Sequence, residues 1–310
     1  MANNNNTVKI LFFGDLVGRP GRFAVRDYLS GKLKVESGKF QTAESGKLKV
    51  ESFSTIDCQP LIFNFQLSTF NFIIANVENA SHGFGLTEKN YNDLSEYGID
   101  CMTSGNHIWD KKEIFNYING AEKLIRPFNY PEDTQGQGSR VFELHDGTKI
   151  GVINALGRVF MSPVDSQWTV VAEEIKRLKD ITPIVIMDFH AEATAEKVCF
   201  AKFCSELCVS AFFGTHTHVQ TADEQIINNM AYITDAGFCG AKDGVIGMDY
   251  KTSVNRFTTV VPERYDVADG NVVQINAVEV EIDKVSGHAV SIRRIFELAD
   301  KNKKEEENER

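Results

Sequence analysis

Gly214-Thr215-His216-Thr217-His218 directly follows an apolar run at residues 209–213 that only Ser210 interrupts. The run predicts a buried strand. Two histidines at i and i+2 of an extended chain bring their rings near one point, with Thr217 turned away. Imidazole is the commonest metal ligand among side chains. A surface histidine beside a hydrogen-bonded loop histidine would explain this short pattern equally well, so the rest of the chain has to decide.

Four other predicted strand ends carry residues that bind metals. Each follows a short apolar run, and together they supply Asp15, Glu78 with Asn79, Asn106 with His107, and His190. Because the carboxyl ends of strands in α/β proteins gather at one edge of the sheet, we expect these clusters to meet. Asp15 taken alone would be interpreted as a turn or helix-cap aspartate.

The donors in these clusters are oxygen and imidazole groups, without thiolates. Such donors suit manganese, iron(II), nickel or zinc. They are too many for one tetrahedral ion, and they fit two ions of higher coordination number that share a carboxylate. Two ions about 3.5–4 Å apart support in-line attack at phosphorus. The clusters therefore predict a dinuclear centre that acts on phosphoric esters.

Composition limits the class of substrate and the cellular compartment that we expect. The 310 residues carry a formal net charge of −10, and no lysine and arginine cluster offsets it locally. Proteins that hold long nucleic acids usually show a basic stripe, so we expect a small anionic substrate instead. The apolar run at residues 8–13 is too short for a signal peptide, and no stretch approaches the roughly 20 apolar residues of a membrane span. We expect a cytoplasmic protein with free thiols and no membrane contact.

Strand-like and helix-like segments alternate along the chain. A helix is predicted at residues 111–119 with Asp110 as its cap, and a hairpin at residues 272–283 and 288–296 comes late. This order predicts an α/β fold with two mixed sheets flanked by helices.

One segment interrupts the pattern. The octapeptide Ser-Gly-Lys-Leu-Lys-Val-Glu-Ser occurs at residues 30–37 and again at residues 45–52. We interpret residues 30–68 as an insertion without catalytic groups in a single domain of residues 1–298. Residues 299–310 are predicted to be a charged flexible tail.

The clusters resemble those of a known enzyme superfamily. Gly105-Asn106-His107, the lone His190 and Gly214 to His218 are similar to the G-N-H, lone-H and G-H-x-H blocks of calcineurin-like metallophosphoesterases. With Gly14-Asp15-Leu16-Val17-Gly18 and Asn76-Val77-Glu78-Asn79-Ala80 in this order, they resemble the bacterial YmdB-type branch more closely. The resemblance covers nearly the whole chain except the insertion and the tail. It implies a four-layer αββα sandwich of two mixed β-sheets flanked by helices.

Some positions depart from the family patterns. Val17 stands where the superfamily has a histidine, and Glu78-Asn79 replaces its aspartate block, but both changes are typical of the branch. Val77 departs from the branch, which usually has glycine there. The bulkier side chain would either crowd the site beside Glu78 or be absorbed by a β conformation.

The resemblance also implies residue roles. Glu78 bridges two divalent ions; Asp15, Asn79 and His218 complete one ion, and Asn106, His190 and His216 complete the other. Iron and manganese are the expected metals, with zinc, nickel and cobalt as alternatives. His107 is the expected general acid, and a structural histidine stacked on Trp109 is the alternative. His82 is a weaker candidate for lining the substrate pocket.

We therefore expect a phosphodiesterase of small cyclic nucleotides, above all of 2′,3′-cyclic nucleoside monophosphates, with 3′,5′-cyclic nucleotides as further substrates. The resemblance implies attack by a hydroxide that bridges the ions, with His107 protonating the leaving group. A phosphomonoesterase or nucleotidase on the same metals is one alternative. A nucleotide-binding regulator with little turnover is another, and a homo-oligomer is left open.

Overall fold

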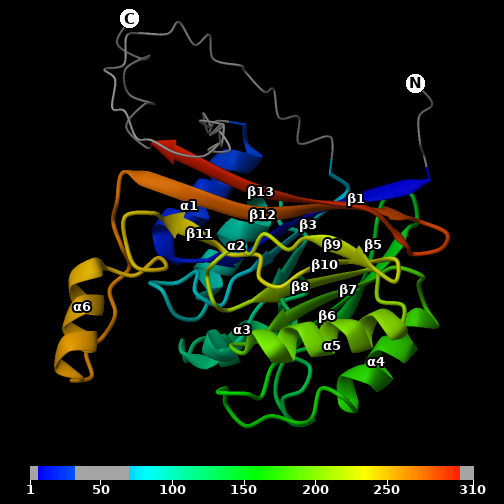
Figure 1. Ribbon diagram of the computed structural model, residues 1–310, viewed down its shortest axis with the longest axis horizontal. Helices are drawn as coiled ribbons and strands as arrows, with labels where there is room; N and C mark the ends of the chain where they lie inside the picture. The colour runs from blue at the N-terminus through cyan, green and yellow to red at the C-terminus, as the bar shows by residue number, and fades with distance from the viewer. Residues whose placement is uncertain (1–5, 32–69, 301–310) are drawn as a thin grey trace, which may run out of the picture.

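The computed structural model describes residues 6–31 and 70–300, which form two β-sheets packed face to face (Figure 1). All but the first two residues of the insertion expected at residues 30–68 lie outside the described residues. Residues 301–310 of the expected tail lie outside them too.

The larger sheet is mixed and has seven strands in the order β2-β11-β12-β1-β3-β4, with β13 paired to β12. β1 runs antiparallel to β12 and parallel to β3. The strands are β1 (Thr7–Phe13), β2 (Asp15–Leu16), β3 (Phe72–Asn76), β4 (Cys101–Thr103), β11 (Phe238–Ala241), β12 (Val272–Asp283) and β13 (Ala289–Asp300).

The smaller sheet has six strands in the order β5-β6-β7-β8-β10-β9. Its central strands β6, β7, β8 and β10 are parallel, and the two edge strands are antiparallel to their neighbours. The strands are β5 (Ser139–Glu143), β6 (Lys149–Leu156), β7 (Val185–His190), β8 (Ala211–Thr215), β9 (Gln225–Ile227) and β10 (Met230–Ile233).

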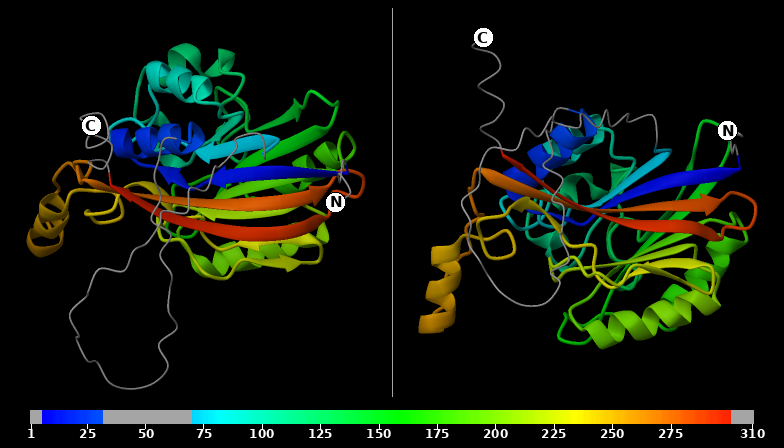
Figure 2. Two further views of the ribbon diagram at one scale, coloured as in Figure 1. Left: turned by 90° about the horizontal axis from the view of Figure 1, so that it is seen from above. Right: turned by 45° about the horizontal axis from the view of Figure 1, so that its top comes forward.

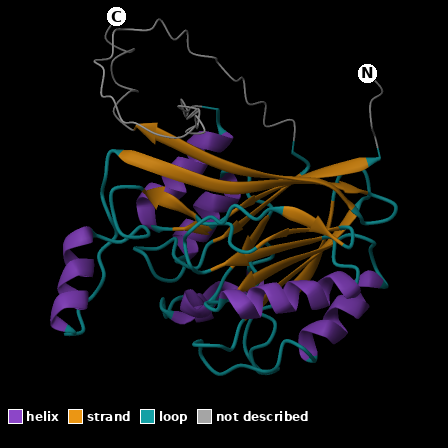
Figure 3. Ribbon diagram, viewed as in Figure 1, coloured by secondary structure: helices purple, strands orange, loops and turns teal. Residues whose placement is uncertain are grey.

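Apolar side chains fill the space between the sheets, where Phe12 and Phe213 stack with their ring centroids 4.3 Å apart. The helices lie outside the two strand layers (Figures 2 and 3). Helices α1 (Gly18–Leu29) and α2 (Glu88–Glu96) pack on the larger sheet, and α4 (Val170–Lys179) and α5 (Thr194–Glu206) on the smaller one. The four layers confirm the expected sandwich. Helix α6 (Tyr250–Thr259) stands away from both sheets in Figure 1.

Local sequence explains where these helices begin and which face they bury. The Thr87 side chain accepts a hydrogen bond from the backbone N–H of Asn90 and so caps α2. Helix α4 buries Val171, Ile175 and Leu178, whose spacing of four and three places them on one face. None of the helices in the described ranges is long and apolar enough to cross a membrane.

Two boundaries differ from those expected. Instead of one helix at residues 111–119, the chain forms short 3-10 turns at Asn106–Trp109 and Ile118–Gly120 around the single turn α3 (Ile114–Tyr117). Ile114, Tyr117 and Ile118 of this segment are nevertheless buried in the apolar cluster on the larger sheet. The last strand continues to Asp300, two residues past the domain boundary expected at 298, because Ala299 is buried against the larger sheet.

The position of Val77, directly after β3, shows whether its side chain crowds Glu78. Its side chain is fully buried in the apolar cluster under α1, together with Ala75 and Ala80. Val77 is not among the described residues with positive φ, so a β-branched side chain fits its backbone. Val77 therefore packs into the core and does not crowd Glu78.

Candidate metal centre

A loop, rather than an extended strand, positions the two histidines of the opening stretch. Strand β8 ends at Thr215, and the φ angles of His216 and His218 are +100° and +61°, in the left-handed region. The strand alternation expected here is therefore wrong. Thr217 does turn away, because its hydroxyl and its backbone N–H both donate to the Asp235 carboxylate.

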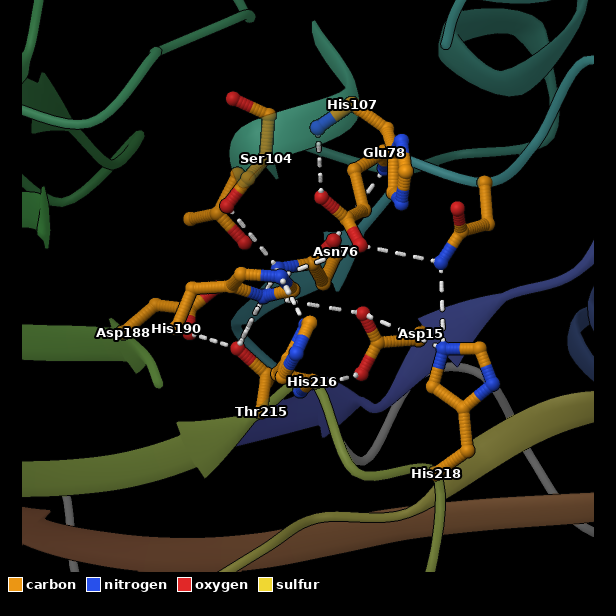
Figure 4. A network of polar contacts seen from close by, with 12 residues as sticks. Asp15, Asn76, Glu78, Ser104, His107, Asp188, His190, Thr215, His216 and His218 are labelled. Carbon is orange, nitrogen blue, oxygen red and sulfur yellow. Dashed lines mark hydrogen bonds and ion pairs between the residues drawn. The ribbon is translucent and has the colours of Figure 1, made fainter. Parts of the chain in front are cut away.

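Two groups of carboxylate and imidazole side chains meet at the carboxyl ends of the strands, and Glu78 belongs to both (Figure 4). One group is Glu78, His190 and His216, and the other is Asp15, Glu78 and His218. Within each group, one donor atom per residue lies within 4.8 Å of the others. His190 Nε2 lies 3.0 Å from Glu78 Oε1 and 3.0 Å from His216 Nδ1. This geometry suits two cations that share one carboxylate.

Three buried oxygen atoms indicate whether cations fit this centre. The Oδ1 atoms of Asp15, Asn79 and Asn106 are buried and have no hydrogen-bond partner among the described residues. A buried polar atom without a partner costs free energy, and a cation would supply the missing interaction. These oxygens belong to the donor types that manganese and iron accept. The residues present therefore fit divalent metal ions.

The two asparagines reach the centre in different ways. Asn79 Nδ2 donates to Glu78 Oε1 at 3.0 Å and lies 3.1 Å from His218 Nε2. Asn106 is placed by Gly105, where an added Cβ would lie 2.2 Å from Glu78 Oε2. Only glycine lets the backbone come this close.

The donors divide by sheet. Strand ends of the larger sheet carry the oxygen donors Asp15, Glu78, Asn79 and Asn106, and strand ends of the smaller sheet carry the imidazoles His190, His216 and His218. The centre therefore lies at the junction of the two sheets.

The charges of the centre are strongly coupled. Burial disfavours a charge on Glu78, but the adjacent His190 outweighs this effect and holds the pKa of Glu78 below its ordinary value. Burial likewise opposes a charged His190, yet Glu78 and Asp15 raise the pKa of His190 to about 9. Burial, reinforced by His190, lowers the pKa of His216 to about 3. His216 is therefore neutral and ready to bind a cation, whereas His190 must first release a proton.

Three polar residues behind the centre are missing from the residues predicted from sequence. His190 Nδ1 lies 2.9 Å from Thr215 Oγ1, which donates to Asp188 Oδ1 at 2.7 Å. Asn76 Nδ2 donates to Asp188 Oδ2 at 2.9 Å, and Asn76 Oδ1 accepts from the backbone of Glu78. Such partners fix the tautomer and orientation of a ligating histidine. The spacing of Asp188 and His190, two apart on one strand, is a signal that could have indicated this.

Glu192 has a similar relation to His216. Its Oε2 lies 3.1 Å from His216 Nε2, while Nδ1 of the same ring faces His190. The two ring nitrogens thus have different partners, and Nδ1 is the one that faces the centre.

His107 lies beside the ligand groups. Its backbone N–H donates to Glu78 Oε2 at 3.1 Å, and its Nδ1 lies 2.9 Å from Asp110 Oδ2. The ring contacts Phe84 edge-on, whereas Trp109 stacks on Phe115, so the alternative of stacking on Trp109 is wrong. The His107 side chain is 30% exposed, so the ring is partly open to solvent beside the centre.

His82 lies apart from the centre. Its exposed side chain lines a cavity of about 620 Å³ together with Arg22, Arg26 and Lys89 from α1 and α2. None of the predicted metal ligands lines this cavity. The position of His82 therefore does not support a contact with substrate at the metals.

Two stacked mixed sheets with this carboxylate and imidazole centre at their junction define a hydrolase of the metallophosphoesterase type. The profile of the YmdB-like protein family matches residues 63–295, and the chain belongs to this family. The chain is thus an enzyme of the phosphoric ester hydrolase class, and the resemblance drawn from the motifs is confirmed.

Similar proteins support the assignment over nearly the whole chain. The chain is 41% identical over 290 residues to the 2′,3′-cyclic-nucleotide 2′-phosphodiesterase of Bacillus subtilis (strain 168), covering 93% of this chain and 97% of that protein. A crystal structure titled as a novel phosphatase from Mycoplasma pneumoniae is 30% identical, with a TM-score of 0.78 and 96% of each chain covered. A hypothetical protein from Thermus thermophilus is 29% identical, with a TM-score of 0.77 and 94% of this chain and all of that one covered.

Proposed function

We propose that this chain is a dinuclear phosphodiesterase that hydrolyses 2′,3′-cyclic nucleoside monophosphates. The observation that carries the proposal is the pair of ligand groups that share Glu78. The Bacillus subtilis relative, whose name states this activity, supports the choice of substrate. The acidic chain, with a net charge of −10, favours a small phosphodiester over a long nucleic acid.

In this proposal, Glu78 is shared by two divalent ions. Asp15, Asn79 and His218 would hold one ion, and Asn106, His190 and His216 the other. When bound, two such ions acidify water and neutralise charge on the phosphoryl group. Oxygen and imidazole donors favour iron or manganese, with zinc, nickel and cobalt as alternatives.

The remaining chemistry falls to His107, which we assign as the general acid. Its Nε2 gives a proton to the leaving ribose oxygen, while Asp110, whose Oδ2 lies 2.9 Å from Nδ1, holds the ring in place. The hydrogen bond from the His107 backbone to Glu78 fixes the distance between this proton donor and the centre.

Two finer assignments belong to the proposal. Hydrolysis of 3′,5′-cyclic nucleotides is a secondary activity, because the same donors can hold any small phosphodiester. A cytoplasmic location is also part of it, and cell fractionation tests that point. Phosphomonoester hydrolysis is the second candidate activity, since it needs the same centre.

The test combines metal analysis with a substrate panel. We expect about two ions per chain after loading with Mn²⁺ or Fe²⁺. Turnover should be faster on 2′,3′-cyclic AMP than on 3′,5′-cyclic AMP, and faster on bis-p-nitrophenyl phosphate than on p-nitrophenyl phosphate. A preference for p-nitrophenyl phosphate would replace the proposal with a phosphomonoesterase. Nucleotide binding by the loaded protein without turnover would indicate a regulator.

A further inference from the structure

The loop that carries His216 and His218 has an unusual backbone. Both histidines adopt positive φ angles, +100° and +61°, which non-glycine residues rarely take. Such conformations persist only where surrounding interactions hold them in place. The residue between them, Thr217, shows which interactions these are.

Asp235, directly after β10, holds this loop. Its Oδ2 accepts hydrogen bonds from Thr217 N at 3.1 Å and from Thr217 Oγ1 at 2.7 Å. Asp235 is 1% exposed, so these bonds do not compete with solvent. One carboxylate oxygen thus fixes the backbone and the side chain of the residue that separates the two histidines.

The other carboxylate oxygen of Asp235 is linked through Gly237 to Asp15, a third predicted ligand of the centre. Asp235 Oδ1 accepts from Gly237 N at 2.8 Å, and the carbonyl of Gly237 accepts from Asp15 N at 2.9 Å. Asp15 Oδ2 in turn accepts from His216 N at 3.1 Å. A closed chain of hydrogen bonds therefore links Asp235 to the positions of Asp15 and His216.

Lys197 balances the buried charge of Asp235. Its Nζ lies 2.6 Å from Asp235 Oδ2, and both side chains are 1% exposed. Lys197 is in the first turn of α5, where the helix dipole disfavours a cation, and burial disfavours it further. Helix stability therefore does not explain its location, whereas pairing with Asp235 does.

We propose that Asp235 is a positioning residue that preorganises His216, His218 and Asp15 for metal binding, and that Lys197 keeps its carboxylate in place. The inference rests on the proposed assignment of these three residues as metal ligands. It predicts that the loss of Asp235 weakens metal binding beyond any effect on the fold.

The test measures the apparent Kd for Mn²⁺ by competition with a fluorescent chelator, together with the Tm of the metal-free protein. Thr217→Val keeps the shape of the side chain and the backbone hydrogen bond to Asp235 but removes the one from the hydroxyl, and we expect roughly tenfold weaker binding at an unchanged Tm. Thr217→Ser keeps the hydroxyl and should bind within about twofold of the parent. Asp235→Asn should weaken binding by about 10- to 100-fold, as is usual for partners of metal ligands.

Asp223→Asn is the matched control. The Asp223 carboxylate also accepts hydrogen bonds from a backbone N–H and a hydroxyl, both of Thr234 directly after β10, but no hydrogen bond joins it to a predicted ligand. Its Kd for Mn²⁺ should match that of the parent.

The outcomes separate this inference from the proposed function. Equal Mn²⁺ affinity in Thr217→Val and Thr217→Ser, or an Asp235→Asn variant that loses Tm but not affinity, would overturn the positioning role alone. A parent protein that binds no metal would overturn the ligand assignment and this inference together. Metal binding without turnover would contradict only the proposed activity.

Discussion

His190 Nε2 lies 3.0 Å from Glu78 Oε1, and the two side chains are at most 1% exposed. The pair is a proton-bearing ion pair in the absence of metal, because the pKa of Glu78 is held low and that of His190 is raised to about 9. A metal ion held by His190, as proposed, would compete with this proton for the same imidazole nitrogen.

Metal binding should therefore release protons and strengthen with pH. Below about pH 9 the metal-free protein carries a proton on His190, and only the neutral ring binds metal, so affinity rises with pH until His190 is neutral near pH 9. Calorimetry with Mn²⁺ in two buffers of different ionisation enthalpy measures the protons released. Equal heats in both buffers at pH 7 would contradict the assignment of His190 as a ligand.

Glu78→Gln should lose metal and activity together. The substitution keeps the size of the side chain but removes the charge that both ligand groups share. Metal content and turnover of bis-p-nitrophenyl phosphate give the result. Glu206→Gln, at the exposed end of α5, is the control for removing one negative charge. A Glu78→Gln variant with two ions and near-normal turnover would show that Glu78 is not shared.

His107→Ala should keep both metals and slow the hydrolysis of substrates with poor leaving groups. A general acid contributes about 10²–10⁴-fold, so turnover of 2′,3′-cyclic AMP should fall by that factor. A p-nitrophenolate leaving group needs little protonation, and the loss on bis-p-nitrophenyl phosphate should be smaller. His145→Ala, in the exposed turn between β5 and β6, should change neither rate. Equal losses on both substrates would exclude the general-acid role.

Val77→Gly should destabilise the protein without improving the centre. The Val77 side chain is fully buried in the core, so its removal costs about 2–4 kcal/mol in the free energy of unfolding. Urea unfolding of the metal-free protein measures this loss, and Val77→Ala separates the cavity from the added backbone freedom. Higher metal affinity in Val77→Gly would mean that the valine does crowd Glu78.

Deleting residues 31–45, one full period of the octapeptide repeat, should leave metal content and kcat within a few-fold of the parent. Shortening a connection by 15 residues changes the free-energy cost of closing it by less than about 1 kcal/mol. The proposed metal ligands all lie outside the insertion. A deletion variant that folds but holds no metal would show that the repeats support the centre.

The strand ends made most of this architecture predictable from sequence. Buried strands produce short apolar runs, and the polar residue that follows each run is carried to the same edge of a sheet. Asp15, Glu78, Asn106 and His190 could be grouped on this basis, and the motif order then indicated the family and its four layers.

Other features depend on contacts that no local pattern shows. The positive φ angles of His216 and His218 flank Thr217, whose hydrogen bonds reach Asp235, 18 residues further along the sequence. Lys197 offers a partial signal, since it is a lone cation among the buried residues Phe200, Ala201 and Cys204 of α5. Its partner on another element can be identified only in the folded protein.

The division of donors between the sheets has a mechanical consequence. Each ion would be coordinated by oxygen atoms from one sheet and by imidazoles from the other, so the pair acts as a non-covalent crosslink across the layers. Ligand binding stabilises a fold by RT ln(1 + [L]/Kd), and here that free energy would stabilise the packing of one sheet on the other. Metal scarcity would then loosen the sandwich at its catalytic edge first, while the Phe12–Phe213 stack still holds the layers together.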